Sequence, residues 1–256
     1  MTEAVLSTDQ LTQYLLRLGD DSLVLGQRLS EWCGHAPSIE LDLSLANVAL
    51  DLIGQATLLL NAAGEAEGQG RDADALAFGR DVMSFRNCLL VEQPNGDFGQ
   101  TIARQFLFSS YQFALFRHLT ASSNTAVAEI CAKAVKETEY HLQLASDWVV
   151  RLGDGTDESR ERLVAGFDWH WRFVGEMFED DALSEAVAAA DIGVLPSTLK
   201  SEFDSRLEAV FNDAGLEIPE LPRSITGGRE GHHSEHLGHL LAVMQHIPRT
   251  YPGAVW

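Results

Sequence analysis

Two stretches with the apolar spacing of long helices constrain the fold of this chain most. They are KAVKETEYHLQLASDW (Lys133–Trp148) and LANVALDLIGQ (Leu45–Gln55), and in both the apolar residues recur every three or four positions. No stretch alternates apolar and polar residues for long enough to indicate a half-buried strand, and the sequence contains no internal repeat. The chain is therefore predicted to be all-α.

Helical spacing extends over most of the sequence, between breaks rich in Gly and Pro. Helices are expected at about residues 8–32, 39–65, 74–91, 98–120, 125–152, 157–178, 196–214 and 234–246. Residues 215–231 hold several Gly and Pro and are expected to form an irregular arm.

The lengths of the connections predict how these helices pack. Short breaks join the first helix to the second and the fourth to the fifth, which makes each pair an antiparallel hairpin. A long crossover holding the 74–91 helix joins the two hairpins. This is a ferritin-like four-helix bundle with one long crossover. We expect one domain over 1–256, with the bundle core at about 8–152 and additional C-terminal helices at about 157–256.

Bundles of this architecture often hold two metal ions, and this sequence carries little of their ligand pattern. Two helices of such a site each present a Glu followed three residues later by a His, and the other two each present a carboxylate. Three residues before His141 stands Thr138, and three residues after Asp51 stands Gly54. A pair of nonheme irons needs carboxylates to balance its charge and to bridge. The sequence therefore predicts the frame of a metal bundle with most of its ligands missing.

The composition of the chain indicates its cellular compartment and disfavours some classes of partner. The chain has 38 acidic and 18 basic residues, a net charge of −20, which disfavours nonspecific binding to nucleic acid or to anionic membranes. Its three cysteines, Cys33, Cys88 and Cys131, are far apart, which argues against structural zinc and disulfides and for a reducing compartment. The first residues lack a basic region followed by an apolar run, and polar residues interrupt the apolar stretch 41–60. We expect a soluble, cytoplasmic protein.

Four runs of the sequence resemble a known family. These are residues 12–56, 89–106, 133–142 and 233–238, and the most specific motifs within them are EWCGHAP (31–37) and VEQPNG (91–96). Together they are similar to the C subunits of bacterial phenylacetyl-CoA epoxidases, also called phenylacetate-CoA oxygenases. The resemblance covers nearly the whole chain.

The resemblance implies a ferritin-like, non-catalytic structural subunit of a multicomponent monooxygenase. That complex epoxidises the aromatic ring of phenylacetyl-CoA in phenylacetate catabolism. Its A subunit, a paralogue of this chain, holds the diiron site and uses O2 and electrons that a reductase with FAD and an iron–sulfur centre delivers from NADPH. The resemblance implies that this chain supports the A subunit and binds no cofactor itself.

The motif of the catalytic paralogue transfers to this chain position by position. With Trp32 and Pro37 as the anchor, its ligand positions fall on Ser22, Asp51, Gly54, Gln105, Thr138 and His141. Asp51 and His141 are the two plausible ligands among these vestigial positions. If Asp51 is buried, it needs a partner, for which His141 is the first candidate and Arg17 or Arg28 the second.

Two further clusters have competing interpretations. In FGRDVMSFRN (78–87), Arg80, Phe85, Arg86 and Asn87 form a possible contact with CoA or with a partner subunit, and a surface salt bridge between the arginines and Asp81 is the alternative.

The second cluster is HHSEHLGH, residues 232–239. His232 and His236, like Glu235 and His239, stand four residues apart on an expected helix, and His233 and His236 stand three apart. The alternative function is therefore a metal-dependent enzyme with a mononuclear site here or at the bundle centre. The sequence leaves open the role of this cluster, the partner of Asp51 and the stoichiometry of the complex.

Overall fold

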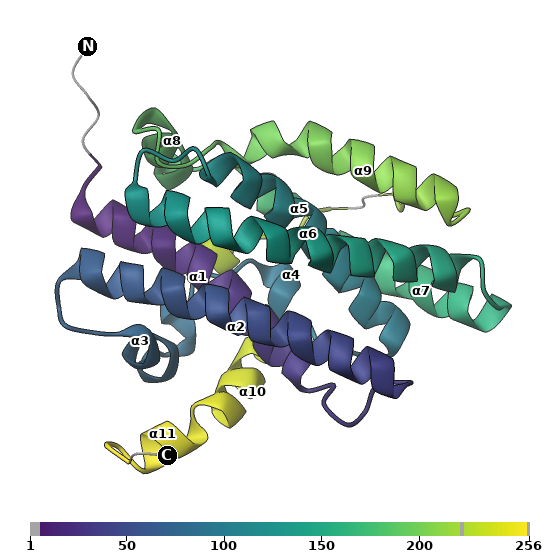
Figure 1. The fold of residues 1–256 in the computed structure, drawn as a ribbon, viewed down its shortest axis with the longest axis horizontal. Helices are drawn as coiled ribbons and strands as arrows, with labels where there is room; N and C mark the ends of the chain where they lie inside the picture. The colour runs from purple at the N-terminus through teal and green to yellow at the C-terminus, as the bar shows by residue number, and fades with distance from the viewer. Residues whose placement is uncertain (1–5, 221–222, 255–256) are drawn as a thin grey trace. The chain divides into compact units, whose positions relative to one another are not determined.

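The computed structural model describes residues 6–220 and 223–254, and within them every regular element is helical (Figure 1). The chain divides into two compact units. One contains residues 6–94 and 226–254, and the other contains residues 95–220 and 223–225. The helices after residue 157, expected to form a single extension, are thus shared between the units.

A long helical hairpin is the core of the first unit. Its helices are α1 (Thr8–Ser30) and α2 (Ile39–Glu67), which lie side by side (Figure 1). Ser7 begins α1 with a capping box, and the Ser38 side chain accepts the Leu41 N–H at the start of α2. Both helices match their expected bounds within two residues, because caps and apolar spacing are local signals.

By length and composition, α2 is also apolar enough to cross a membrane. In the most apolar 18-residue stretch of α2, 44% is buried inside the structure, and the helix packs on α1. The core helix of a soluble protein passes the same test, so this observation is weak support for a membrane span.

The crossover in the same unit is not the single helix expected at 74–91. It consists of α3 (Ala73–Gly79), the short 3-10 turn η1 (Val82–Ser84) and α4 (Leu89–Glu92). Carboxylates of α1 interrupt it: Asp20 accepts the Arg86 N–H at 2.8 Å and Asp21 accepts the Cys88 N–H at 2.8 Å. Those amides bond to α1 instead of continuing a helical ladder, so the prediction of one helix was wrong.

Residues 226–254, here called the return arm, come back to this unit. The arm contains η4 (Gly228–Glu230), α10 (Glu235–Met244) and α11 (His246–Thr250). A Cβ at Gly231, where φ is +90°, would stand 2.4 Å from the Met83 carbonyl oxygen, so only glycine allows the arm this approach. Gln245 Nε2 donates to the Ala77 and Arg80 carbonyls, both at 2.9 Å, and holds α10 against the crossover.

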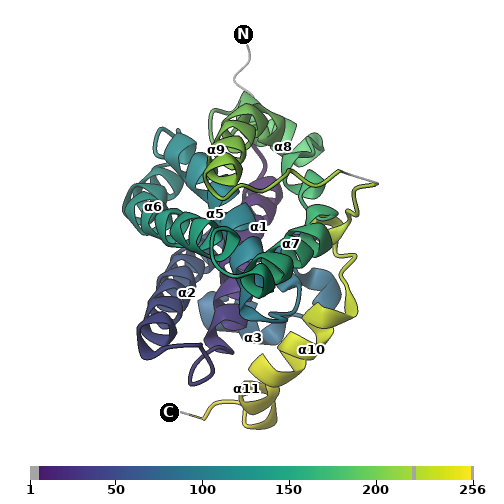
Figure 2. The same ribbon diagram turned by 90° about the vertical axis from the view of Figure 1, so that its right-hand side faces the viewer.

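The second unit is built around α5 (Phe98–Leu119). Against it pack α6 (Thr125–Gly153) and α7 (Asp157–Trp171) (Figure 2). A Cβ at Gly166 would stand 2.7 Å from Gln100 Cα, which shows how closely α7 approaches α5. The helix expected to reach residue 178 ends at Trp171 and is followed by the 3-10 turn η2 (Gly175–Phe178).

The rest of the second unit follows α7 in the sequence, and its longest helix packs on α5 and α6. It comprises α8 (Ala182–Ala189), which was not expected, then η3 (Pro196–Leu199) and α9 (Lys200–Asp213). Phe106 of α5, Phe167 of α7 and Phe211 of α9 form a buried aromatic cluster, with 4.7 Å between the ring centroids of Phe167 and Phe211. These rings join three helices into one core.

Candidate functional site

The three vestigial positions of the first unit differ in burial. Ser22 is fully buried in α1, and its Oγ donates to Gln55 Oε1 on α2 at 3.5 Å. Gly54 is exposed, and a Cβ built there would meet nothing within 4 Å. Asp51 is half-buried. The interior face of α2 therefore passes through Leu52 and Gln55, so the prediction that Gly54 faces inward was wrong, whereas Asp51 stays partly buried.

Sequence spacing did not reveal Gln55 because two sets of residues on α2 share the same period. Leu52, Gln55 and Leu59 repeat with helical spacing, and so do Leu50, Gly54 and Leu58. The structure buries the first set and exposes the second. An apolar stripe on the outer face thus hid the correct register.

The vestigial positions of the second unit are all buried. Gln105 on α5 donates from Nε2 to Ser109 Oγ at 2.8 Å, and Thr138 on α6 donates to the Val135 carbonyl at 3.0 Å. His141, one turn further along α6, has no exposed surface. Ser109 was not predicted, and its spacing of four residues from Gln105 was the available signal.

Within each unit the buried polar groups at these positions are mostly poor ligands for iron. Ser22 and Gln55 in the first unit, and Gln105 and Thr138 in the second, offer neutral hydroxyl and amide groups, which do not balance the charge of a metal ion. His141 is the one strong ligand type among the buried positions. Across residues 6–220 and 223–254, no three His, Cys, Asp or Glu side chains gather closely enough to hold a metal ion.

The charged groups of the first unit instead form a buried cluster, which we call the charged clasp. It joins Asp20 and Asp21 of α1 to arginines of the crossover and the return arm. Arg80 binds both Asp20 oxygens, at 2.9 Å from Nη1 to Oδ2, and its guanidinium lies 4.3 Å from the centre of the Phe85 ring. Arg229 forms two bonds to Asp21, at 2.7 and 3.0 Å. Two Arg–carboxylate forks therefore hold three segments together.

The second half of the clasp centres on Glu92 in α4. Its carboxylate accepts the Ser234 N–H at 2.6 Å and Asn87 Nδ2 at 2.9 Å, and it lies 2.7 Å from His233 Nδ1. The other ring nitrogen of His233 is 3.1 Å from the Phe85 carbonyl oxygen. The side chains of Glu92 and His233 have no exposed surface. The motifs VEQPNG and HSEHLG therefore meet in this pair.

The clasp corrects the interpretation of residues 80–87. Arg80, Phe85 and Asn87 are buried, so Phe85 presents no ring face to an adenine and Arg80 presents no free guanidinium to a phosphate. Arg86 donates from Nε to Gln13 and from Nη1 to the Met83 and Phe85 carbonyls. The predicted CoA contact at these residues is therefore not supported. The alternative salt bridge with Asp81 was wrong as well, because Asp81 pairs with Arg249.

The histidine cluster at 232–239 is divided by the start of a helix. Because α10 begins at Glu235, His232 and His236 do not share a helix face, and that prediction was wrong. His233 is bonded inside the clasp, and the His236 carbonyl accepts from Arg28 at 2.9 Å. Glu235 and His239 do lie four residues apart on α10 and are exposed.

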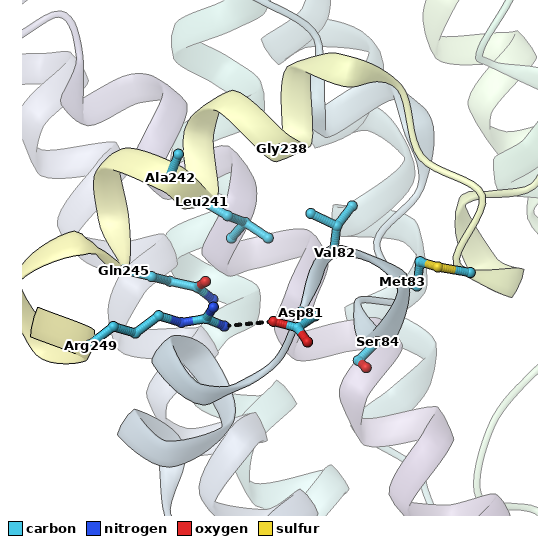
Figure 3. A pocket seen from close by; sticks show the side chains of 9 residues that line it. All are labelled: Asp81, Val82, Met83, Ser84, Gly238, Leu241, Ala242, Gln245 and Arg249. Carbon is cyan, nitrogen blue, oxygen red and sulfur yellow. Dashed lines mark hydrogen bonds and ion pairs between the residues drawn. The ribbon is translucent and has the colours of Figure 1, made fainter. Parts of the chain in front are cut away.

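A groove of about 500 Å³ lies between the crossover and α10 (Figure 3). Val82 and Met83 line it from the crossover, and Gly238, Leu241 and Ala242 line it from α10. The ion pair between Asp81 and Arg249, at 3.1 Å, stands at its edge. Its lining contains one hydroxyl, that of Ser84, but no histidine, cysteine or lysine. The groove therefore shows no nucleophile paired with a histidine base.

Burial governs the titration of three groups. Desolvation raises the pKa of Asp21, and the charge and hydrogen bonds of Arg229 oppose that rise. Burial raises the pKa of the Cys131 thiol to about 12, which keeps it protonated and unreactive at neutral pH. Burial, then the nearby charge of Arg104, lowers the pKa of His170 well below its usual value. His170 is therefore neutral in the folded protein at neutral pH.

Comparison with solved structures identifies the class of fold. A protein from Synechococcus with aldehyde deformylating oxidase activity matches with a TM-score of 0.63, over 85% of this chain and 95% of that chain. The sequence identity is 14%, so the likeness concerns the fold alone. The molecule is an all-α protein of the ferritin-like class, as the sequence predicted.

Sequence comparison gives the family. Residues 2–256 match the PaaA_PaaC family, described as phenylacetic acid catabolic protein, and the chain belongs to this family. Among curated proteins it is 48% identical over 248 residues to the C subunit of 1,2-phenylacetyl-CoA epoxidase from Escherichia coli (strain K12). That match covers 97% of this chain and 100% of the other protein, and it confirms the resemblance drawn from the sequence motifs.

Proposed function

We propose that this chain is a structural subunit of a phenylacetyl-CoA epoxidase, without a catalytic centre of its own. The observation that carries the proposal is its 48% identity to the C subunit of such an enzyme, over 97% of this chain. The second support is the set of neutral groups at Ser22, Gln55, Gln105 and Thr138, which is unsuited to an iron pair. In this role the protein holds a catalytic partner in its active form by binding it.

The expected partner is a diiron A subunit that epoxidises the aromatic ring of phenylacetyl-CoA. A reductase with FAD and an iron–sulfur centre would supply electrons from NADPH. We expect the complex to be cytoplasmic. Within it, the charged clasp gives this subunit a rigid scaffold, because buried Arg–carboxylate forks fix the crossover and the return arm on α1.

Co-expression with an A subunit tests the proposal. The two chains should elute together from a size-exclusion column at micromolar concentration, and iron should accompany the A subunit. Epoxidation by the A subunit with its reductase should rise when this chain is added. Separate elution, with unchanged activity, would remove the basis of the proposed role.

Metal analysis tests the absence of a catalytic centre. The chain expressed alone in medium supplemented with iron and zinc should purify with far less than one metal ion per molecule. A near-stoichiometric metal that is lost on His141→Ala, but kept on the control His239→Ala, would establish a metal site at the bundle centre. That result would favour the alternative of an enzyme in its own right.

A further inference from the structure

The outer face of α2 carries an apolar stripe that neither the clasp nor the vestigial positions use. Its large members are Ile39, Leu43, Leu50 and Leu58, whose exposed fractions are 77%, 61%, 65% and 37%. Gly54 and Thr57 lie on the same face and are exposed. At 1.5 Å of rise per residue, the stripe from Ile39 to Leu58 is about 28 Å long. Large exposed apolar side chains that share one helix face are typical of an interaction site.

Acidic residues border the stripe. Glu40 and Glu65 are both exposed and are separated by 25 residues, close to seven helical turns, so they lie on one edge of it. A backbone hydrogen bond, with one from Ser38, lowers the pKa of Glu40, so its carboxylate is charged at neutral pH. Asp42 lies toward the other edge, and α2 contains no Lys or Arg. The stripe therefore lies beside a line of negative charge.

We infer that this face of α2 docks the proposed diiron partner, through a partner surface that is apolar at its centre and rich in Lys or Arg along its rim. The inference rests on the proposed function and adds the location of the contact. Complementary rim charges and an apolar centre are the usual composition of a specific interface. The stripe also explains why an apolar set of residues with helical spacing persists on the solvent side of α2.

Charge argues against two other occupants. In a dimer formed through this face, the acidic edges of two α2 helices would lie in the same interface. Neither helix contains a basic residue to offset them, so the two edges would repel each other. A membrane surface carrying anionic lipids would be repelled by the same carboxylates, whereas helices that lie on membranes carry Lys and Arg on their polar side. A protein surface with an apolar centre and a basic rim complements both the apolar stripe and its acidic edge.

The test compares two variants in complex formation with the A subunit. The stripe variant is Leu43→Glu with Leu50→Glu, and the control is Val243→Glu on α10, whose side chain is 81% exposed. The stripe variant should bind at least about tenfold more weakly, because apolar centres carry most of the affinity of an interface. The control should bind like the wild type. Unchanged circular dichroism and melting temperature would show that both variants fold.

Salt dependence tests the charged edge. Wild-type affinity should fall as NaCl rises from about 50 to 500 mM, and Glu40→Gln with Glu65→Gln should weaken this dependence. Equal binding by the stripe variant and the wild type would overturn the inference and leave the proposed function intact. Failure of the wild type to bind would remove both. A stripe variant that abolishes self-association or vesicle flotation of the isolated chain, and leaves binding to the A subunit unchanged, would assign the face to a second copy or a membrane.

Discussion

The Glu92–His233 pair should be the most sensitive point of the first unit, and His233→Ala tests it. In the wild type one ring nitrogen faces the Glu92 carboxylate at 2.7 Å and the other faces the Phe85 carbonyl at 3.1 Å. The imidazole therefore links the Glu92 side chain to the backbone of the crossover. Removing it leaves the fully buried Glu92 side chain without one of its hydrogen-bond partners.

The size of the effect follows from that burial. Leaving a buried polar group without its hydrogen-bond partner costs about 1–3 kcal/mol, because the remaining group stays out of water. At about 2–4 °C per kcal/mol for a chain of this size, the melting temperature should fall by roughly 2–12 °C. His239→Ala is the matched control, because His239 lies exposed on α10. It should change the free energy of unfolding by less than about 0.5 kcal/mol.

Urea unfolding measures how much His233→Ala lowers the free energy of unfolding, and hydrogen exchange shows which helices lose protection. Exchange should increase in the return arm and in α4, and should stay unchanged in α6 and α7. The double variant Glu92→Gln with His233→Gln replaces the pair with two amides and should be less destabilised than the sum of its single variants. A cost below about 1 kcal/mol for His233→Ala, or exchange equal to that of His239→Ala, would refute the reasoning.

Three other outcomes are expected. Gly231→Ala should destabilise the protein by more than about 1 kcal/mol in urea unfolding, because φ is +90° and the new Cβ would lie 2.4 Å from the Met83 carbonyl. Because the folded state does not bind a proton at His170 and the unfolded chain does below about pH 6.5, stability should fall as pH decreases. His170→Gln should remove up to about 1.4 kcal/mol per pH unit of that loss, measured by urea unfolding at pH 5 and 7. Incubation with a chelator should leave the melting temperature unchanged, and a fall in it would indicate a structural metal ion.

The helices of the two hairpins could be predicted because their signals are local. Ser7 and Ser38 mark helix starts, and apolar spacing marks the helix bodies. The broken crossover could not be predicted, because Asp20 and Asp21 divert its amides from more than 60 positions away in the sequence. The spacing of apolar residues along one helix does not indicate which distant residues contact it.

Part of the candidate site could be placed from the sequence. Ser22, Gln105, Thr138 and His141, four of its six predicted positions, are buried. Gly54 on α2 is exposed instead, because both faces of that helix carry apolar residues with the same spacing. Burial distinguishes the two faces, and burial depends on tertiary packing that spacing alone does not specify.

The division of the chain into units has a consequence for its synthesis. The α1 carboxylates emerge from the ribosome early, but Arg229 and His233 follow only after the 131 residues from 95 to 225. At 5–20 residues per second, the first hairpin waits roughly 7–26 s for the segment that binds Asp21 and Glu92. By the end of that interval all the helices of the second unit have been synthesised. Nascent chains arrested before residue 226 should therefore contain a folded second unit beside a hairpin that still recruits chaperones.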